Sequence, residues 1–198
     1  MFTVPAAAQQ TVASNRDRPV LALTVVGLAT FQPVDGSFVS ENAPYLDRGL
    51  GGFGVGAAAE LNLFTVSHVS AAVEVSTAAV SAVQHGRLVG GAANGRFRET
   101  LVSALAGLAT TSHDLQLLAG VSWRGGTPTL NGVAIGDPDA GHAAFTAGAE
   151  VGRPIGARTA LVAHVRYSVA PRTEREKEIG IGSQIIRAGV GVRVIVAQ

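Results

Sequence analysis

Three glutamates and three arginines fall at positions where extended strands would turn their side chains to one shared interior. They are Glu60, Glu74, Glu150, Arg166, Arg187 and Arg193, and the polar residues Asn62, Gln116 and His164 have the same phase. Three acids against three bases form a balanced set, which favours a salt-bridged interior over a catalytic carboxylate pair. Glu60 and Glu74 should lie nearly opposite each other, and two unpaired carboxylates there would repel. We therefore expect an arginine from across the fold between them.

The spacing of the remaining polar residues does not support nucleophilic catalysis or metal binding. His68 and Ser70 are two residues apart and would share a face, but no third acid is placed to orient the histidine. Asp137 and Asp139 fall far short of a calcium-binding loop, so a turn is the better interpretation. The sequence contains no cysteine, which removes disulfides and zinc-thiolate sites. We expect no enzyme activity, no cofactor and no metal.

Period-2 alternation predicts that β-strands position these charges. In segment 185–196, one face carries Ile186, Ala188, Val190, Val192, Val194 and Val196, while arginines and glycines occupy the other. Segment 158–169 alternates in the same way around His164 and Arg166. Each segment exceeds the about 9–11 tilted residues that cross a membrane. A polar face of arginine, glycine and histidine predicts a lumen inside and lipid outside.

Eight such segments can be counted along the chain, and their connections alternate in length. The segments are 20–31, 51–64, 69–83, 97–110, 115–124, 142–153, 158–169 and 185–196. The inward sides of 20–31 and 97–110 stay open, because both of their faces are apolar. Four connections are long, at 33–50, 84–96, 125–141 and 170–184, and the three between them are short. This layout predicts an all-β, eight-stranded antiparallel up-and-down barrel, with short periplasmic turns and long extracellular loops.

Composition narrows the class further. The 198 residues are 47% hydrophobic and only 15% charged, with a net charge of +1. Nucleic acid binding needs a basic surface that this chain lacks. The most apolar run, 19–34, is rich in Val, Thr and Gly, which favour strand over helix. Such a chain is either a membrane barrel or a soluble all-β protein with a buried apolar core.

Aromatic residues are scarce and cluster near the long-loop ends of the expected strands. They are Phe31, Phe53, Phe97, Trp123, Phe145 and Tyr167, with Phe64 at the opposite end. Aromatic rings prefer the membrane–water boundary, where they form girdles around transmembrane barrels. We interpret the six as interface aromatics; the alternative is a ring of core aromatics that closes one end of a soluble barrel.

Over residues 20 to 196, this architecture resembles the small eight-stranded outer-membrane barrels of the OmpA/OmpX type. The resemblance implies a monomer in the bacterial outer membrane, surrounded by lipid and lipopolysaccharide. Residues 20–198 would form the barrel domain. Residues 1–19 would be an N-terminal tail, either a plain extension or the remnant of a signal peptide followed by a linker.

The expected function is non-enzymatic, with a structural or surface-interaction role carried by the long loops. Loop 170–184 is the most polar; its run of alternating charges, 172–178, is expected to be a solvated tip that could meet an envelope or surface protein. Two alternatives remain open at this point. One is a small gated pore for small solutes, and the other is a soluble, lipocalin-like carrier whose apolar face would point inward around a ligand.

Overall fold

The computed structural model describes residues 20–34, 51–64, 68–85, 92–110, 114–134 and 141–197. The predicted tail 1–19 lies outside these residues, as do most of loop 33–50 and the pair Asp137 and Asp139. Among the described residues, no helix is both long enough and apolar enough to cross a membrane.

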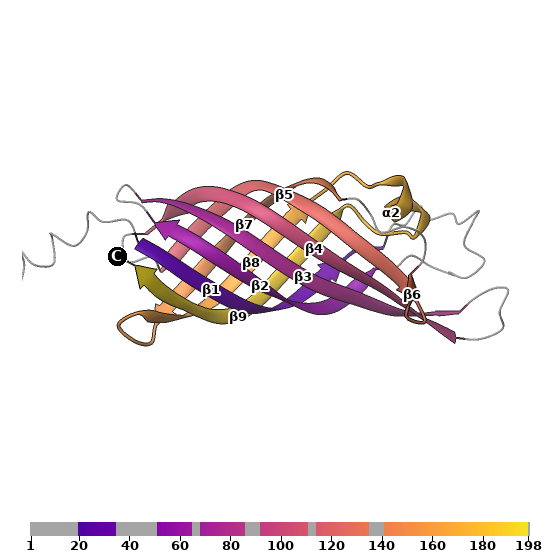
Figure 1. The fold of residues 1–198 in the computed structure, drawn as a ribbon, viewed down its shortest axis with the longest axis horizontal. Coiled ribbons are helices and arrows are strands. Elements are labelled where there is room, and N and C mark those ends of the chain that lie inside the picture. Colours follow the sequence, from indigo (N-terminus) through magenta and orange to yellow (C-terminus); the bar gives the residue numbers. More distant parts are fainter. Residues whose placement is uncertain are drawn as a thin grey trace, which may run out of the picture.

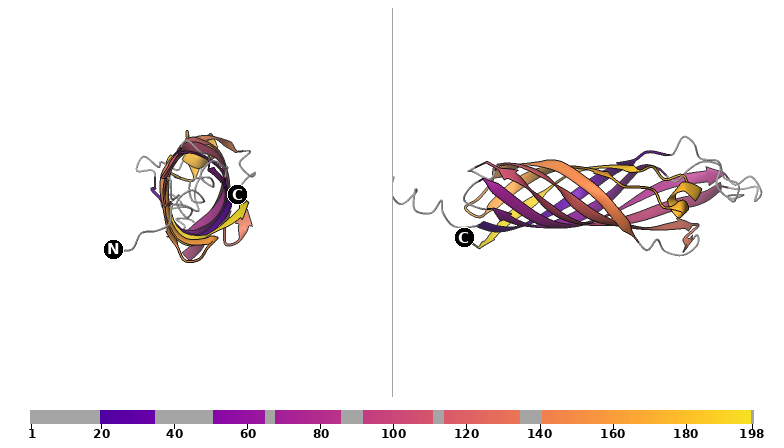
Figure 2. Two further views of the ribbon diagram at one scale, coloured as in Figure 1. Left: turned by 90° about the vertical axis from the view of Figure 1, so that its left-hand side faces the viewer. Right: turned by 90° about the horizontal axis from the view of Figure 1, so that it is seen from above.

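Eight long antiparallel strands close into a barrel, which confirms the predicted fold class (Figures 1 and 2). The strands are β1 (Val20–Gln32), β2 (Gly52–Phe64), β3 (Val69–His85), β4 (Ala92–Ala109), β5 (Leu115–Leu130), β7 (His142–Pro154), β8 (Thr159–Val169) and β9 (Gln184–Ala197). Each pairs with its neighbour along the chain, and β9 pairs with β1 to close the ring. A two-residue strand, β6 (Val133–Ala134), folds back on the end of β5. The described helix α2 (Glu174–Glu178) lies between β8 and β9.

Side chains alternate strictly between the lumen and the outer surface. On β9, Val190, Val192 and Val194 are exposed on the outside, whereas Arg187 and Arg193 are buried inside. The outer surface is largely valine, leucine, alanine and aromatic residues, an apolar belt of the kind that lipid covers. This orientation contradicts the lipocalin-like carrier, which requires the apolar face to point inward.

The structure settles the two strands whose faces the sequence left open. On β1 the inward residues are Ala22, Thr24, Val26, Leu28, Thr30 and Gln32, and on β4 they include Glu99, Leu101, Ser103 and Leu105. Apolar residues occur on both faces because the narrow lumen also needs apolar filling between its polar layers.

Five of the six expected interface aromatics are partly or well exposed on the outer surface, and Phe97 differs. Phe31, Phe53, Trp123, Phe145 and Tyr167 are 36–78% exposed, and the rings of Phe31 and Phe53 contact each other at 4.8 Å. Phe97 is only 1% exposed and points into the lumen. Its assignment to the interface is wrong, because Phe97 has the same phase on β4 as the inward residues Glu99 and Leu101.

Strands β3, β4 and β5 are longer than predicted, with 17, 18 and 16 residues. The predicted loops 84–96 and 125–141 are therefore partly strand. A membrane crossing takes about 9–11 strand residues, so these three strands continue well beyond the apolar belt. In Figure 1 they project from the long-loop end of the barrel.

Candidate functional site: the charged lumen

Two buried charge networks occupy the lumen. The turn-side network, in the half near the short connections, consists of Glu60, Glu74, Glu150, His164, Arg166 and Arg193. The loop-side network, in the half near the long connections, consists of Glu99, Arg124, Glu176 and Arg187. The side chain of every member is at most 5% exposed. Charges this deep require partners, because burying an unpaired charge costs several kcal/mol.

In the turn-side network, Arg166 joins two carboxylates from the opposite wall. Glu60 and Glu74 are register partners on β2 and β3, and Arg166 projects toward them from β8. Its Nε donates to Glu74 Oε2 at 3.0 Å, and its Nη2 donates to Glu60 Oε2. A guanidinium presents several donors in a fixed fork, so one arginine can neutralise two acids held apart by a strand spacing.

The rest of the turn-side network links β7, β8 and β9. His164 lies 3.6 Å from Glu150 through Nδ1 and 3.8 Å from Glu74 through Nε2. Arg193 pairs with Glu150, and its guanidinium lies 5.2 Å above the ring of buried Phe64. The network thus holds three carboxylates against two guanidiniums, with the histidine between two of the acids.

The predicted polar residues lie beside this network. The Asn62 amide donates to Thr24 Oγ1 at 3.0 Å, and Gln116 donates to Asn62 Oδ1 at 3.1 Å. Arg193 in turn donates to the Gln116 carbonyl oxygen at 3.4 Å. Neutral hydrogen bonds therefore continue the ionic layer across the lumen.

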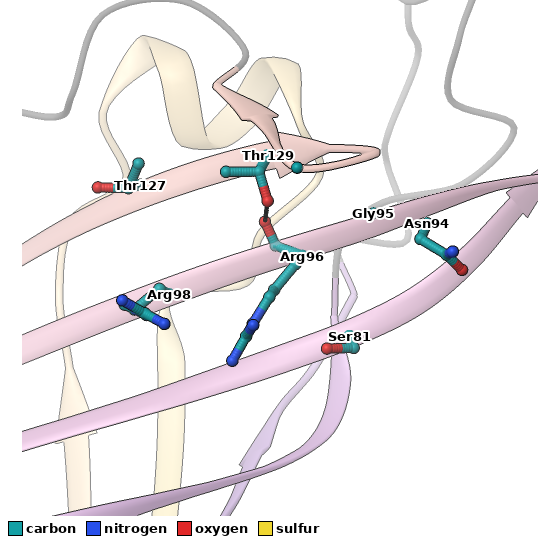
Figure 3. Close-up of a pocket in the computed structure, with 8 residues that line it drawn as sticks. Ser81, Asn94, Gly95, Arg96, Arg98, Thr127 and Thr129 are labelled. Carbon is teal, nitrogen blue, oxygen red and sulfur yellow. Dashed lines mark hydrogen bonds between the residues drawn. The ribbon is translucent and has the colours of Figure 1, made fainter.

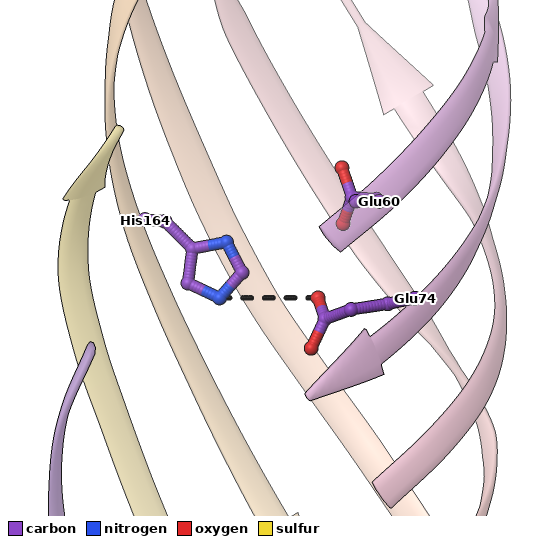
Figure 4. A group of neighbouring side chains, drawn as sticks. All are labelled: Glu60, Glu74 and His164. Atoms are coloured by element: carbon purple, nitrogen blue, oxygen red, sulfur yellow. Dashed lines mark ion pairs between the residues drawn. The ribbon is translucent and has the colours of Figure 1, made fainter. Parts of the chain in front are cut away.

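Glu60, Glu74 and His164 have the residue types of a metal site, and their potential ligand atoms lie within 4.8 Å of one another (Figure 4). Arg166, however, already contacts both carboxylates and supplies the positive charge that a cation would bring. A metal ion there would face a buried guanidinium at short range, which is strongly unfavourable. The arrangement fits an ion-pair network, and we assign no metal site.

The loop-side network was only partly foreseen. Glu99 on β4 accepts hydrogen bonds from Arg124 Nε at 2.7 Å and from Arg187 Nη2 at 2.5 Å. Arg187 also donates to the Ser76 hydroxyl. Arg187 therefore pairs in this network and not with Glu60, Glu74 or Glu150, so the six expected charges do not form one cluster.

Loop 170–184 folds into the mouth of the barrel. Glu176 from α2 is buried and lies 3.1 Å from Arg124 and 3.5 Å from His142. Ile179 and Ile181 pack against Phe97 in a buried cluster. The prediction of a solvated tip is wrong for this part of the loop, because apolar residues 179 and 181 anchor it inside. Glu174 and Lys177 remain exposed and pair with each other.

A layer of hydroxyls and small apolar side chains fills the space between the charges. Ser103, Ser122, Thr146 and Ser168 form a hydrogen-bonded row across β4, β5, β7 and β8, with contacts of 2.6–2.8 Å. Apolar groups add two buried clusters, one of Val26, Leu28 and Ala58 and another of Ala72, Leu105 and Leu118. The lumen is thus packed in layers, as expected for eight strands.

Sequence reasoning missed Glu99, Arg124 and Glu176. Arg124 has the phase of Gln116 and Ser122 on the same strand, so alternation alone could have found it. Glu99 shares a phase with Ser103, but the apolar neighbours on both faces of β4 hid this signal. Nothing local in the charged run 172–178 indicates that Glu176 turns inward.

No protein-family model matches the chain, and no curated protein matches it in sequence. Several solved structures do share its fold. Ail, the attachment invasion locus protein of Yersinia pestis, solved with the heparin analogue sucrose octasulfate, aligns with a TM-score of 0.57 at 9% identity, over 90% of this chain and 99% of Ail. Neisserial surface protein A aligns with a TM-score of 0.56 at 13% identity, over 88% and 96% of the two chains.

The chain therefore has the fold of the small eight-stranded outer-membrane β-barrels. The apolar belt and this fold together are those of a barrel that spans a membrane with its strands.

Proposed function

We propose that the chain is a non-enzymatic outer-membrane barrel with a sealed lumen, whose role is structural or is exerted through its extracellular surface. The observation that carries this proposal is the double charge network. Strands from all sides of the barrel send carboxylates and guanidiniums into the lumen, and each network is buried. An ion or solute passing through would have to displace both networks and the hydroxyl row between them.

A small gated pore is the alternative. The folded loop 170–184 could in principle move away from the mouth, and this would release Glu176, Ile179 and Ile181. The turn-side network argues against a simple gate, because all six of its members are residues of the barrel strands and none belongs to loop 170–184. Opening the loop alone would leave the lumen blocked.

Planar-bilayer recording tests the sealed lumen. We expect no steady conductance from the unmodified protein, and none after deletion of residues 172–180, because the turn-side network still blocks the barrel. Large, stable openings in the unmodified protein would establish the pore in place of the sealed barrel. The deletion variant also reports on the gate, since conductance that appears only there would mean that the loop closes a channel.

The extracellular role is tested by trimming the four long connections in turn, at 33–50, 84–96, 125–141 and 170–184. Each variant is compared in an assay of binding to surfaces and in an assay of envelope integrity. Lipopolysaccharide and outer-membrane lipid are the proposed surroundings, and the exposed part of loop 170–184 is a proposed contact for a surface or envelope protein. If all four trimmed variants bind surfaces normally but weaken the envelope, the interaction role is wrong and the structural role stands.

A further inference from the structure

The outer wall of the projecting strands β3, β4 and β5 changes character along its length. The register aligns Val75, Val102 and Trp123 as an outward-facing row, and all three are exposed apolar or aromatic residues. The next row toward the loop end is Thr77, Thr100 and Gly125. The apolar surface of these three strands therefore ends between the two rows, and Trp123 lies at the boundary between the hydrocarbon core and the headgroups.

Two arginines follow immediately above this boundary on the outer face. Arg98 pairs in register with Ala79 and Thr127, and Arg96 pairs with Ser81 and Thr129. Arg98 is four residues beyond Val102, a rise of about 10 Å for a strand with the usual tilt. That height is the region of the lipid headgroups, within easy reach of an arginine side chain.

These arginines line a hollow of about 610 Å³ whose other walls are small and polar (Figure 3). The hollow is bordered by Ser81, Asn94, Gly95, Arg96, Arg98, Thr127, Thr129 and Gly132. Figure 3 shows the Arg96 side chain extending from β4 toward β3, on the side of Ser81. Hydroxyl, amide and guanidinium groups supply hydrogen-bond donors here, and none of the described lining residues is a carboxylate.

The charge of this hollow has no counterpart in the part of the chain that the structure describes. Every buried arginine of the lumen has a carboxylate partner, whereas Arg96 and Arg98 have no ion pair with a described residue. Two guanidiniums two residues apart on one strand face hold two positive charges side by side. Arginine binds phosphate oxygens through paired N–H donors, and it keeps its charge at a wet interface.

We propose that Arg96 and Arg98 bind the phosphorylated headgroup of an outer-leaflet glycolipid, with Ser81, Thr127 and Thr129 as hydroxyl partners. The site faces sideways, just above the apolar belt, so a headgroup reaches it while its acyl chains lie against Val102 and Trp123. The inference rests on the proposed outer-membrane function and adds a site and a ligand class to it. A soluble phosphate or sulfated sugar has the same anionic chemistry but gains nothing from the apolar wall below.

The test uses the full chain in detergent, with native mass spectrometry to count bound bis-phosphorylated lipid A and to titrate its affinity. The double variant Arg96→Ser, Arg98→Ser should lose about 10-fold or more in affinity, because two charge-assisted phosphate contacts are removed. The matched control is Arg153→Ser with Arg158→Ser, two exposed arginines at the short-turn end. This control should bind like the unmodified protein.

Two further arms identify the source of the phosphate. Lipid A stripped of phosphate should bind the unmodified protein as weakly as phosphorylated lipid A binds the double variant. Millimolar inorganic phosphate should not displace the lipid; displacement would assign the site to a soluble anion and overturn the lipid assignment. Equal affinities of the double variant and the unmodified protein would overturn the site itself. Bilayer recordings on the same double variant test the sealed lumen independently. The lipid site can prove wrong while the variant still shows no conductance, and the sealed lumen would then stand.

Discussion

Glu60 and Glu74 are direct register partners on neighbouring strands, and both of their buried carboxylates contact one guanidinium, that of Arg166. Two adjacent buried acids would repel in the absence of this arginine. The partner comes from β8, on the far side of the lumen, so this contact ties opposite walls of the barrel together. Loss of the arginine should therefore destabilise the barrel more than loss of either glutamate.

Replacing Arg166 with methionine should destabilise the barrel by roughly 3–5 kcal/mol, because it leaves two buried carboxylates without their cation. Glu60→Gln should cost clearly less, since the turn-side network has three carboxylates against two guanidiniums. Urea unfolding in lipid vesicles measures both variants. Arg158→Met, at an exposed turn position, is the control. If the two network variants cost the same, the arginine is not the central member.

Replacing Val192 with arginine should destabilise the barrel by about 2–4 kcal/mol if this residue lies near the lipid midplane. Val192 is outward-facing on β9 and 41% exposed. Thr100→Arg, also outward but at the boundary row of β4, should cost only about 0–1 kcal/mol. The same unfolding assay compares them. A neutral Val192→Arg would show that this face does not meet lipid.

Replacing Ile181 with aspartate should release loop 170–184 from the mouth of the barrel. Ile181 is fully buried against Phe97 and Ile179, and a carboxylate there would have no partner among the apolar groups of this cluster. Trypsin should then cut faster after Arg172, Arg175 or Lys177, as fragments on a gel would show. Ile155→Asp, at an exposed position of the short-turn end, should leave the cleavage rate unchanged. Unchanged cleavage in Ile181→Asp would mean that the isoleucine does not anchor the loop.

Replacing Gly148 with valine should destabilise the barrel by about 1–3 kcal/mol through overpacking. Gly148 is the register partner of Arg166, and a Cβ atom there would lie 2.7 Å from Arg166 Cδ and 2.2 Å from the Val165 carbonyl oxygen. The bulk would push the guanidinium away from its two acids. Gly156→Val is the control, since its nearest neighbour would be 3.9 Å away. Equal stability of the two variants would show that Gly148 does not make room for Arg166.

The sequence by itself determined the eight strands, their order and the inward phase of most lumen charges. Each of these is a local property, because alternation along one strand needs no knowledge of its neighbours. Val192 and Arg193 are on opposite faces for this reason alone. The Glu60–Glu74 pair could be anticipated as well, since one short turn sets the register between β2 and β3.

Only the tertiary structure decided which charges meet across the lumen. Arg187 pairs with Glu99 and not with the expected acids, because the tilt and stagger of the strands set the height at which each side chain enters the lumen. Phe97 points inward because it shares the phase of Glu99 and Leu101, on a strand whose inward face only the closed barrel decides. Glu176 is buried because Ile179 and Ile181 find an apolar contact in Phe97, on a strand more than seventy residues earlier. Such contacts depend on closure of the barrel, which no local pattern encodes.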